Sequence, residues 1–286
     1  FGAANTALNN GGVVGAVTFN VRNGTYAEQL ALTSVVGANA AQTITFQSET
    51  NDSTAVTLQF NSTSSAQNYV VQLTGADWFL FRKMTLRSLN TTNARIVTFQ
   101  GGADNNIFEN NRFVGVTTTS TSDVRTLLYS PSGTTDNGNI IRNNFFQNGS
   151  DGIFIQGNSA TNLYETGTQI VKNHFQNQYR RSIDLVNQNA PLVEDNRINV
   201  TSTNPTYNGI VIRLCTNQLK VTKNQVYLNG GTLGISIQSC TSTTNNRGLV
   251  ANNFIRVSGT NTGVAALFCL SSSYQNILFN SVLQSN

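Results

Sequence analysis

The chain has 286 residues, of which only 10% are charged, and its formal net charge is +4. Thr, Ser, Asn and Gly replace the charged residues that usually make up about a quarter of a soluble chain. The positive charge comes from scattered arginines rather than a basic patch, which argues against a nucleic-acid partner. No apolar stretch reaches 18 residues, so no segment is expected to insert into a membrane.

The first twelve residues differ from the rest of the chain. Residues 3–8 form the only plausible short helix, which the glycine pair Gly11-Gly12 should close. We expect this helix to cover the first turn of the fold. The predicted organisation is therefore an N-terminal cap at residues 1–12, followed by one further domain at residues 13–286.

Short segments then alternate apolar and polar residues with a period of two, the pattern of a strand with one buried face. Between them, Asn23-Gly24-Thr25-Tyr26 predicts a turn. The first such segments are residues 17–21, 42–46, 56–60 and 69–73.

Seven asparagines recur in the same local setting, at intervals of 23 to 33 residues. Each follows a short apolar run and precedes another apolar residue two positions later. A repeat of this length with no helix-period stretch predicts an all-β fold, a right-handed parallel β-helix. The seven are Asn111, Asn144, Asn173, Asn196, Asn224, Asn253 and Asn280.

This asparagine column has a physical reason in a β-helix. The residue at the bend between two strands often has a left-handed backbone, which asparagine tolerates better than other non-glycine residues. Side-chain amides on coils about 4.8 Å apart can also bond to one another. We therefore expect a structural asparagine ladder that starts after Met84, which takes the asparagine's place one coil earlier.

In five repeats, a second run of alternating apolar and other residues begins with a small residue. Each repeat should therefore hold at least two strands. The three cysteines lie six residues after the glycines of their strands, which predicts one column on successive coils. We interpret this column as small buried side chains, with a disulfide or metal site as the alternative. The five starting residues are Gly152, Ser182, Gly209, Gly234 and Gly263, and the cysteines are Cys215, Cys240 and Cys269.

Several motifs carry a family resemblance. They are residues 8–26 (LNNGGVVGAVTFNVRNGTY), 28–29 (EQ), 43–49 (TITFQSE), 75–77 (GAD), 81–84 (FRKM) and 140–144 (IIRNN). They resemble the right-handed parallel β-helix domains of large secreted proteins of Bacteroidota. In that family the domain is usually the N-terminal part of a long chain with a C-terminal sorting domain for type IX secretion. The resemblance implies an extracellular or cell-surface location and the remainder of a longer chain as a partner.

The end of the sequence agrees with a larger parent chain. Residues 274–286 stop just after an asparagine turn, and nothing resembles the cap that a solenoid needs over its open edge. We expect the chain to be a fragment of a longer polypeptide, or a partner to cover its end.

One group of ionisable residues stands out beside the alternating strands. Arginines in such a group can bind a uronate, and its carboxylates can hold calcium weakly; no other cofactor or metal is indicated. Two insertions, residues 117–123 and 158–167, lengthen coils on a side that often binds ligands in solenoids. The predicted ligand-binding cluster is Asp151, Tyr179, Arg180, Arg181, Asp184 and Arg213.

The predicted function is a non-catalytic extracellular scaffold, adhesin-like or glycan-binding. One alternative is a lyase or glycoside hydrolase acting on acidic polysaccharide, with Asp184, Arg213 and Arg181 as candidates. Against it, the carboxylate sets of polygalacturonase-like hydrolases and pectate lyases are missing, and His174 is interpreted as a turn residue. The other alternative is cargo or partner of a type IX secretion machine, in contact with outer-membrane components.

Overall fold

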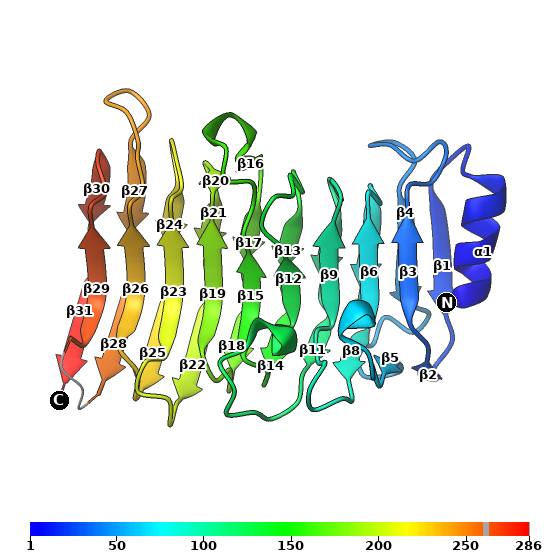
Figure 1. The fold of residues 1–286 in the computed structure, drawn as a ribbon, viewed down its shortest axis with the longest axis horizontal. Helices are drawn as coiled ribbons and strands as arrows, with labels where there is room; N and C mark the ends of the chain where they lie inside the picture. Colours follow the sequence, from blue (N-terminus) through cyan, green and yellow to red (C-terminus); the bar gives the residue numbers. More distant parts are fainter. Residues whose placement is uncertain (260–262, 286) are drawn as a thin grey trace.

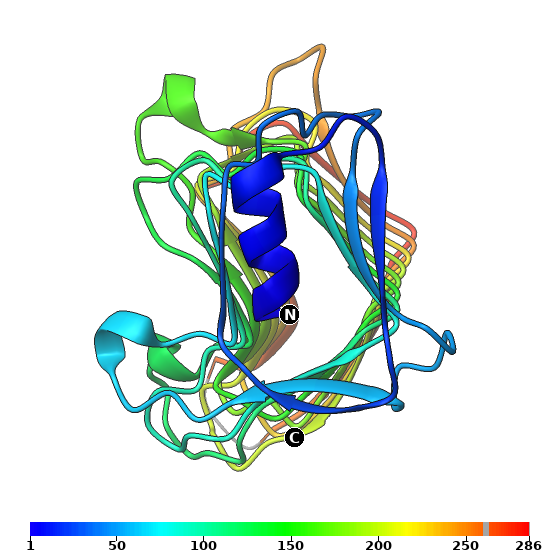
Figure 2. The same cartoon turned by 90° about the vertical axis from the view of Figure 1, so that its right-hand side faces the viewer.

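The computed structural model describes residues 1–259 and 263–285, so residues 260–262 and the last residue of the expected domain lie outside it. The described residues form a parallel β-helix with a single α-helix at its N-terminal end (Figure 1). Each coil passes through three long sheets in turn, which Figure 2 shows along the axis. The predicted all-β, parallel β-helix class is therefore confirmed, and a typical coil holds three strands, in agreement with the expected minimum of two.

Sheets 1 and 2 hold ten strands each, and all neighbouring strands within them are parallel. Sheet 1 comprises β1 (Val17–Val21), β4 (Ile44–Ser48), β7 (Phe79–Arg82), β10 (Ile107–Glu109), β13 (Ile140–Arg142), β17 (Gln169–Val171), β21 (Leu192–Glu194), β24 (Lys220–Thr222), β27 (Gly248–Ala251) and β30 (Gln275–Leu278). Sheet 2 comprises β2 (Gly24–Ala27), β5 (Val56–Phe60), β8 (Thr85–Ser88), β11 (Arg112–Val114), β14 (Phe145–Gln147), β18 (His174–Gln176), β22 (Arg197–Thr201), β25 (Gln225–Asn229), β28 (Phe254–Ser258) and β31 (Ser281–Ser285).

Sheet 3 holds nine strands, and a two-stranded sheet and three short 3-10 helices lie in the longer loops. Sheet 3 comprises β3 (Leu30–Thr33), β6 (Val71–Thr74), β9 (Val97–Gln100), β12 (Leu128–Ser130), β15 (Asp151–Ile155), β19 (Arg181–Val186), β23 (Asn208–Arg213), β26 (Leu233–Gln238) and β29 (Ala265–Leu270). The smaller elements are β16 (Glu165–Thr166), β20 (Gln188–Asn189), η1 (Ser65–Gln67), η2 (Asp123–Arg125) and η3 (Thr161–Leu163).

The helix α1 (Gly2–Gly11) lies across the end of the first coil (Figure 2). Its Leu8 is buried in the core, and Gly12 ends it at a φ of 63°, which glycine adopts without strain. The predicted capping helix is thus confirmed. No helix in the described ranges is long and apolar enough to cross a membrane.

The interior consists of stacked side chains, because the parallel register places equivalent residues of successive coils above one another. Phe46, Phe81 and Phe108 stack in sheet 1 at ring-centroid distances of 5.3 and 5.1 Å. In sheet 2, Phe146 stacks 4.8 Å from Phe175. The turn expected at residues 23–26 is wrong, since residues 24–27 form strand β2. This strand pairs in parallel with β5 and extends sheet 2 to the first coil.

The corner between sheets 1 and 2 is a bend of one left-handed residue. The prediction that the column asparagines have a left-handed backbone is wrong, because the residue before each of them has that conformation. The bend turns the following side chain inward, so the column asparagines from Asn111 to Asn253 are buried. The left-handed residues, with φ between 55° and 58°, are Lys83, Asn110, Asn143, Lys172, Asp195, Lys223, Asn252 and Phe279.

Each buried asparagine then satisfies polar groups on neighbouring coils. Asn173 Nδ2 donates to the Ile141 carbonyl at 2.8 Å and to Asn196 Oδ1 at 3.1 Å. Its Oδ1 accepts from the Asn144 backbone N–H at 2.9 Å. Equivalent bonds recur along the column, which begins where Asn111 accepts from the Met84 N–H.

The last coil departs from the expected register by three residues. Leu233 pairs with Ala265 and Ile237 pairs with Cys269, so Gly263 is not aligned with the earlier strand starts. Cys240 instead donates its N–H to Ser272 Oγ. The predicted column of three cysteines is therefore wrong: Cys215 and Cys240 are buried on adjacent coils, Cys269 is exposed, and all three are free thiols.

The buried asparagine and the bend residue before it should contribute differently to stability. Asn144→Ala removes the side-chain partners of the Phe108 carbonyl and the Asn111 N–H and should lower the free energy of unfolding by about 2–4 kcal/mol. Asn143→Gly keeps an allowed left-handed bend and should change it by less than about 1 kcal/mol. Urea unfolding of both variants measures the difference, and equal losses would contradict the assignment.

Candidate functional site

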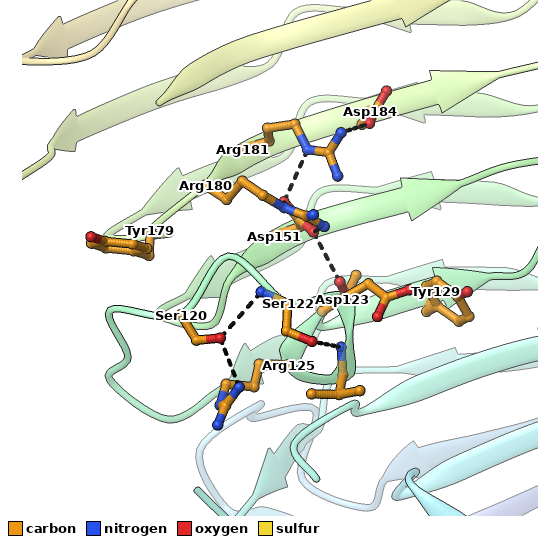
Figure 3. Close-up of polar contacts among 12 residues, drawn as sticks. Ser120, Ser122, Asp123, Arg125, Tyr129, Asp151, Tyr179, Arg180, Arg181 and Asp184 are labelled. Atoms are coloured by element: carbon orange, nitrogen blue, oxygen red, sulfur yellow. Dashed lines mark hydrogen bonds and ion pairs between the residues drawn. The ribbon is translucent and has the colours of Figure 1, made fainter. Parts of the chain in front are cut away.

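The predicted ionisable cluster forms on the outer side of sheet 3. Asp151 begins β15 and pairs in register with Arg181 at the start of β19. Asp184 follows three residues later on β19, and Arg213 ends β23 on the next coil. Arg180 immediately precedes β19, and Figure 3 shows its guanidinium directed at Asp151. Strand register, rather than sequence proximity, therefore brings these five residues together.

Positive and negative groups alternate along this cluster. Asp151 Oδ1 accepts from Arg180 Nε at 2.9 Å and from Arg181 Nε at 3.1 Å. Arg181 also forms an ion pair with Asp184. Arg213 Nη2 lies 2.7 Å from Asp184 Oδ2 and completes the chain of charges. We call these five residues the arginine–aspartate chain.

Both carboxylates of the arginine–aspartate chain are 0% exposed. Burial raises the pKa of Asp184, and the charges of Arg181 and Arg213 oppose that shift. Burial alone would lower the pKa of Arg180, but the hydrogen bond and charge of Asp151 raise it overall. The two buried carboxylates are thus paired with the arginines that cover them, and together they form a closed cluster of low dielectric.

Aromatic rings line the sheet beneath these arginines. The Arg181 guanidinium lies 4.5 Å from the Phe154 ring centroid, and Arg95 lies 3.6 Å from that of Tyr129. The column of outward residues that contains Phe154 and Asp184 ends at Phe268, three residues beyond the position that the spacing of Gly234 and Gly263 would give, and the next column ends at Leu270. The shift has the same cause as the misplaced cysteine, namely the three-residue change of register before β29.

The insertion at residues 117–123 leads into η2 beside this cluster (Figure 3). Arg125 Nη1 donates to Ser120 Oγ at 2.8 Å and holds the loop in place. Thr126, just after η2, donates its hydroxyl to Asp151 Oδ2 at 3.0 Å. The segment that follows the insertion therefore takes part in enclosing Asp151.

The sixth predicted residue is not part of the cluster. Figure 3 shows the Tyr179 ring pointing away from the arginines, and its backbone N–H donates to the Gly149 carbonyl. His174 also differs from its interpretation as a turn residue, because it lies in strand β18 with its ring 5.2 Å from that of Phe145.

The geometry limits what the arginine–aspartate chain can do chemically. A general base must reach the proton that it removes, but Asp184 is covered by Arg181 and Arg213. Calcium requires six to eight oxygen ligands, whereas the Asp151 and Asp184 oxygens are occupied by guanidinium and hydroxyl donors. Within residues 1–259 and 263–285, no group of three or more His, Cys, Asp or Glu residues is arranged to hold a metal ion.

A second row of acids was not predicted from the sequence. Asp77 and Asp104 accept the backbone N–H groups of Asp104 and Asn137, and Glu165 Oε1 accepts that of Asp136. Burial raises the pKa of Glu165 to about 8, although a hydrogen bond from Gln188 opposes the shift. The acids lie in two neighbouring columns, and the signal was present in their spacing: Asp77 and Asp104 are 27 residues apart, and Asp136 and Glu165 are 29 apart, both within the range of the asparagine repeat.

Comparisons with known proteins bear on the fold alone. No protein-family model matches the chain, and no curated protein matches it. Among solved structures it is similar to a GH136 lacto-N-biosidase from Eubacterium ramulus, with a TM-score of 0.51 and 10% identity over 98% of this chain and 64% of that one. The chain thus spans less than two thirds of that enzyme's length.

Two further solved structures are more distant. The Dettilon tailspike protein has a TM-score of 0.40 and 12% identity over 89% of this chain and 62% of that one. The Streptococcus pneumoniae surface protein and adhesin PfbA has a TM-score of 0.38 and 13% identity, over 97% and 94% of the two chains.

The closed cluster makes a prediction about stability. Asp184→Ala leaves Arg181 and Arg213 without their shared carboxylate and should lower the free energy of unfolding by about 3–5 kcal/mol. Ser236→Ala, on the same outward column but outside the arginine–aspartate chain, is the control and should cost about 1 kcal/mol. Denaturant unfolding compares the two, and a loss at Asp184 no larger than the control would contradict a structural role.

Glu165 predicts a pH dependence. Between its model-peptide value of 4.5 and its folded value of about 8, the folded state keeps a proton that the unfolded chain releases. The free energy of unfolding should therefore fall as the pH rises through this range, by several kcal/mol since one pKa unit equals about 1.4 kcal/mol. Glu165→Gln should flatten this slope in unfolding titrations, and parallel slopes for both proteins would disprove the assignment.

Proposed function

We propose that this chain is a non-catalytic β-helix scaffold of the extracellular or cell-surface type, and that it binds glycans on its outer surface. The observation that carries the proposal is the burial and the ion pairing of Asp151 and Asp184. Each is 0% exposed, and each is bound by two arginines. Asp184, the candidate catalytic carboxylate of the sequence, therefore takes part with Asp151 in ion pairs that link three coils.

An enzymatic function would require a different arrangement of these groups. A glycoside hydrolase needs two carboxylates on either side of the bond that it breaks. A lyase needs a base with access to the proton beside the substrate carboxylate. Asp184 meets neither condition while Arg181 and Arg213 occupy it, so the geometry disfavours the lyase and hydrolase alternative. The likeness to the lacto-N-biosidase concerns the fold and adds no catalytic residue.

Support for binding comes from the regular exterior of the coils. Side chains at equivalent positions repeat along the axis on rigid parallel strands, as the pairing of Arg197, Gln225 and Phe254 illustrates. Such a surface presents side chains at a constant spacing on a rigid backbone, which limits the ordering cost of binding. A polymer with a repeating unit is the ligand that fits a repeating surface.

The second alternative, cargo or partner of a type IX secretion machine, concerns how such a protein would reach the cell surface. It rests on the sequence resemblance to Bacteroidota β-helix domains, as do the longer parent chain and the outer-membrane partner. A role in secretion is compatible with glycan binding, since it would act through other parts of the parent chain.

The function is tested by incubating the protein with a panel of neutral and acidic polysaccharides, with binding and chain cleavage measured in the same samples. We expect binding to at least one polysaccharide and no increase in reducing ends or unsaturated products. Cleavage that disappears in Asp184→Asn, a variant close in shape, would overturn the non-catalytic assignment. Absence of both binding and cleavage across the panel would overturn glycan binding.

A further inference from the structure

Basic and aromatic residues gather on the outward face of sheet 2 and on the left-handed bends that lead into it. We call this surface the basic face. The chain contributes these residues from seven successive coils, so they are far apart in sequence. The basic face comprises Lys83, Arg112, Phe145, Lys172, His174, Arg197, Lys223, Tyr227, Phe254 and Arg256.

Three hollows of the protein surface lie on the basic face, the first on the earlier coils and the other two side by side on the three coils of β22, β25 and β28. The first, of about 610 Å³, is lined by Lys83, Arg112 and Lys172. The second, of about 410 Å³, lies between Lys223 and Phe254. The third, of about 380 Å³, is lined by Arg197, Arg256 and others, and it shares Tyr227 with the second. The hollows are open to solvent, as expected for sites that take an extended ligand rather than a small enclosed one.

The charge of the basic face is poorly compensated within the protein. Of its six lysines and arginines, only Lys223 forms an ion pair in the described part of the chain, with Glu194 at 2.7 Å. Lys83 donates to the neutral Asn51 at 2.7 Å. Asp195 is the single acidic residue that lines the three hollows. The surface therefore favours an anionic ligand.

Aromatic rings alternate with these charges. Arg112 lies 5.1 Å from the Phe145 ring centroid, and Phe145 in turn meets His174 edge to face. Further along the axis, Tyr227 and Phe254 lie 5.5 Å apart, and Phe254 is 43% exposed. Exposed rings of this kind can pack against the apolar face of a sugar ring. Burial and the charge of Arg197 lower the pKa of His174, so its imidazole is neutral at pH 7.

The spacing of the coils sets the kind of ligand that fits. Neighbouring strands lie about 4.8 Å apart, so the six steps from the coil of Lys83 to that of Arg256 cover about 29 Å. One step is close to the length of one sugar unit in an extended polysaccharide. A chain with regularly spaced carboxylate or sulfate groups would meet a cation or an aromatic ring on most coils.

We propose that the basic face binds an anionic polysaccharide, carrying carboxylate or sulfate groups, along the axis of the β-helix. The proposal rests on the proposed glycan-binding function and specifies the surface and the ligand class. It also qualifies the interpretation of the positive charge as scattered, because strand register brings six of the lysines and arginines to one face. The amide groups of Asn110 and Asn143, which line the first hollow, would hydrogen-bond the hydroxyl groups of the same sugar chain.

The test compares three probes: polygalacturonate, dextran sulfate and uncharged dextran. We expect the protein to bind one or both of the charged polymers, with an affinity that falls as salt is added, and not the dextran. The double variant Lys172→Gln/Arg197→Gln removes two unpaired charges of the basic face and should weaken binding about tenfold. The matched control Lys220→Gln/Arg247→Gln removes two exposed charges outside the three hollows and should stay within about twofold.

Each other outcome overturns a defined part of the proposal. If both double variants weakened polymer binding equally, the attraction would come from net charge alone. The basic face would then be rejected as the binding site, while glycan binding itself would stand. Binding to dextran as tight as to the charged polymers would refute the anionic ligand class. Competition by single-stranded DNA at equal strength would make the face a general polyanion site. No binding to any of the three probes would reject this proposal, whereas the proposed glycan-binding function would be rejected only by a negative result across the wider polysaccharide panel. Unchanged thermal unfolding of all variants confirms that they are folded.

Discussion

The structure depends on a one-residue bend that must recur at the same place in every coil. A left-handed residue turns the chain from sheet 1 into sheet 2, and this bend leaves backbone groups without partners inside the protein. The asparagine that follows satisfies them, as when Asn173 bonds the Ile141 carbonyl and the Asn144 N–H. Because unpaired buried polar groups are costly, the column fixes the register of the coils. That register then stacks the phenylalanines in the core and aligns the charges outside.

The same alignment has opposite consequences on two faces. On sheet 3 it places aspartates of adjacent coils beside arginines, and the result is a buried chain in which each charge is neutralised by its neighbours. On sheet 2 it gathers lysines and arginines with almost no acids among them, and their charge remains available to solvent. From residue types alone, the arginine–aspartate chain was a catalytic candidate and the basic face was not recognised. Burial and pairing decide which of the two can meet a ligand.

The sequence predicted features that follow from local pattern and period. The β-helix and the start of the asparagine column after Met84 come from repeats that can be counted along the chain, and the capping helix from the different composition of the first twelve residues and their closing glycines. It failed where three-dimensional pairing decides the outcome. The left-handed position is displaced by one residue, because both neighbours in pairs such as Asn110-Asn111 are asparagines and either suits a bend. Cys269 was misplaced because the longer connection before β29 shifts the register by three residues. Five members of the candidate site were grouped correctly, but the burial of Asp184 was not visible in the sequence. It depends on the cover given by Arg181 on the same strand and by Arg213 on the next one.

A rigid row of weak contacts is an effective way to hold a polymer. A single exposed ion pair contributes only about 0.2–1 kcal/mol, too little for a useful site on its own. Six cations on a frame that needs no reordering add their contributions along one ligand chain, and each contact raises the effective concentration of the next. The left-handed bends matter here as well, because Lys83, Lys172 and Lys223 occupy them and are directed outward by the same geometry that turns the asparagines inward. The element that stabilises the β-helix therefore also positions half of the lysines and arginines on the basic face.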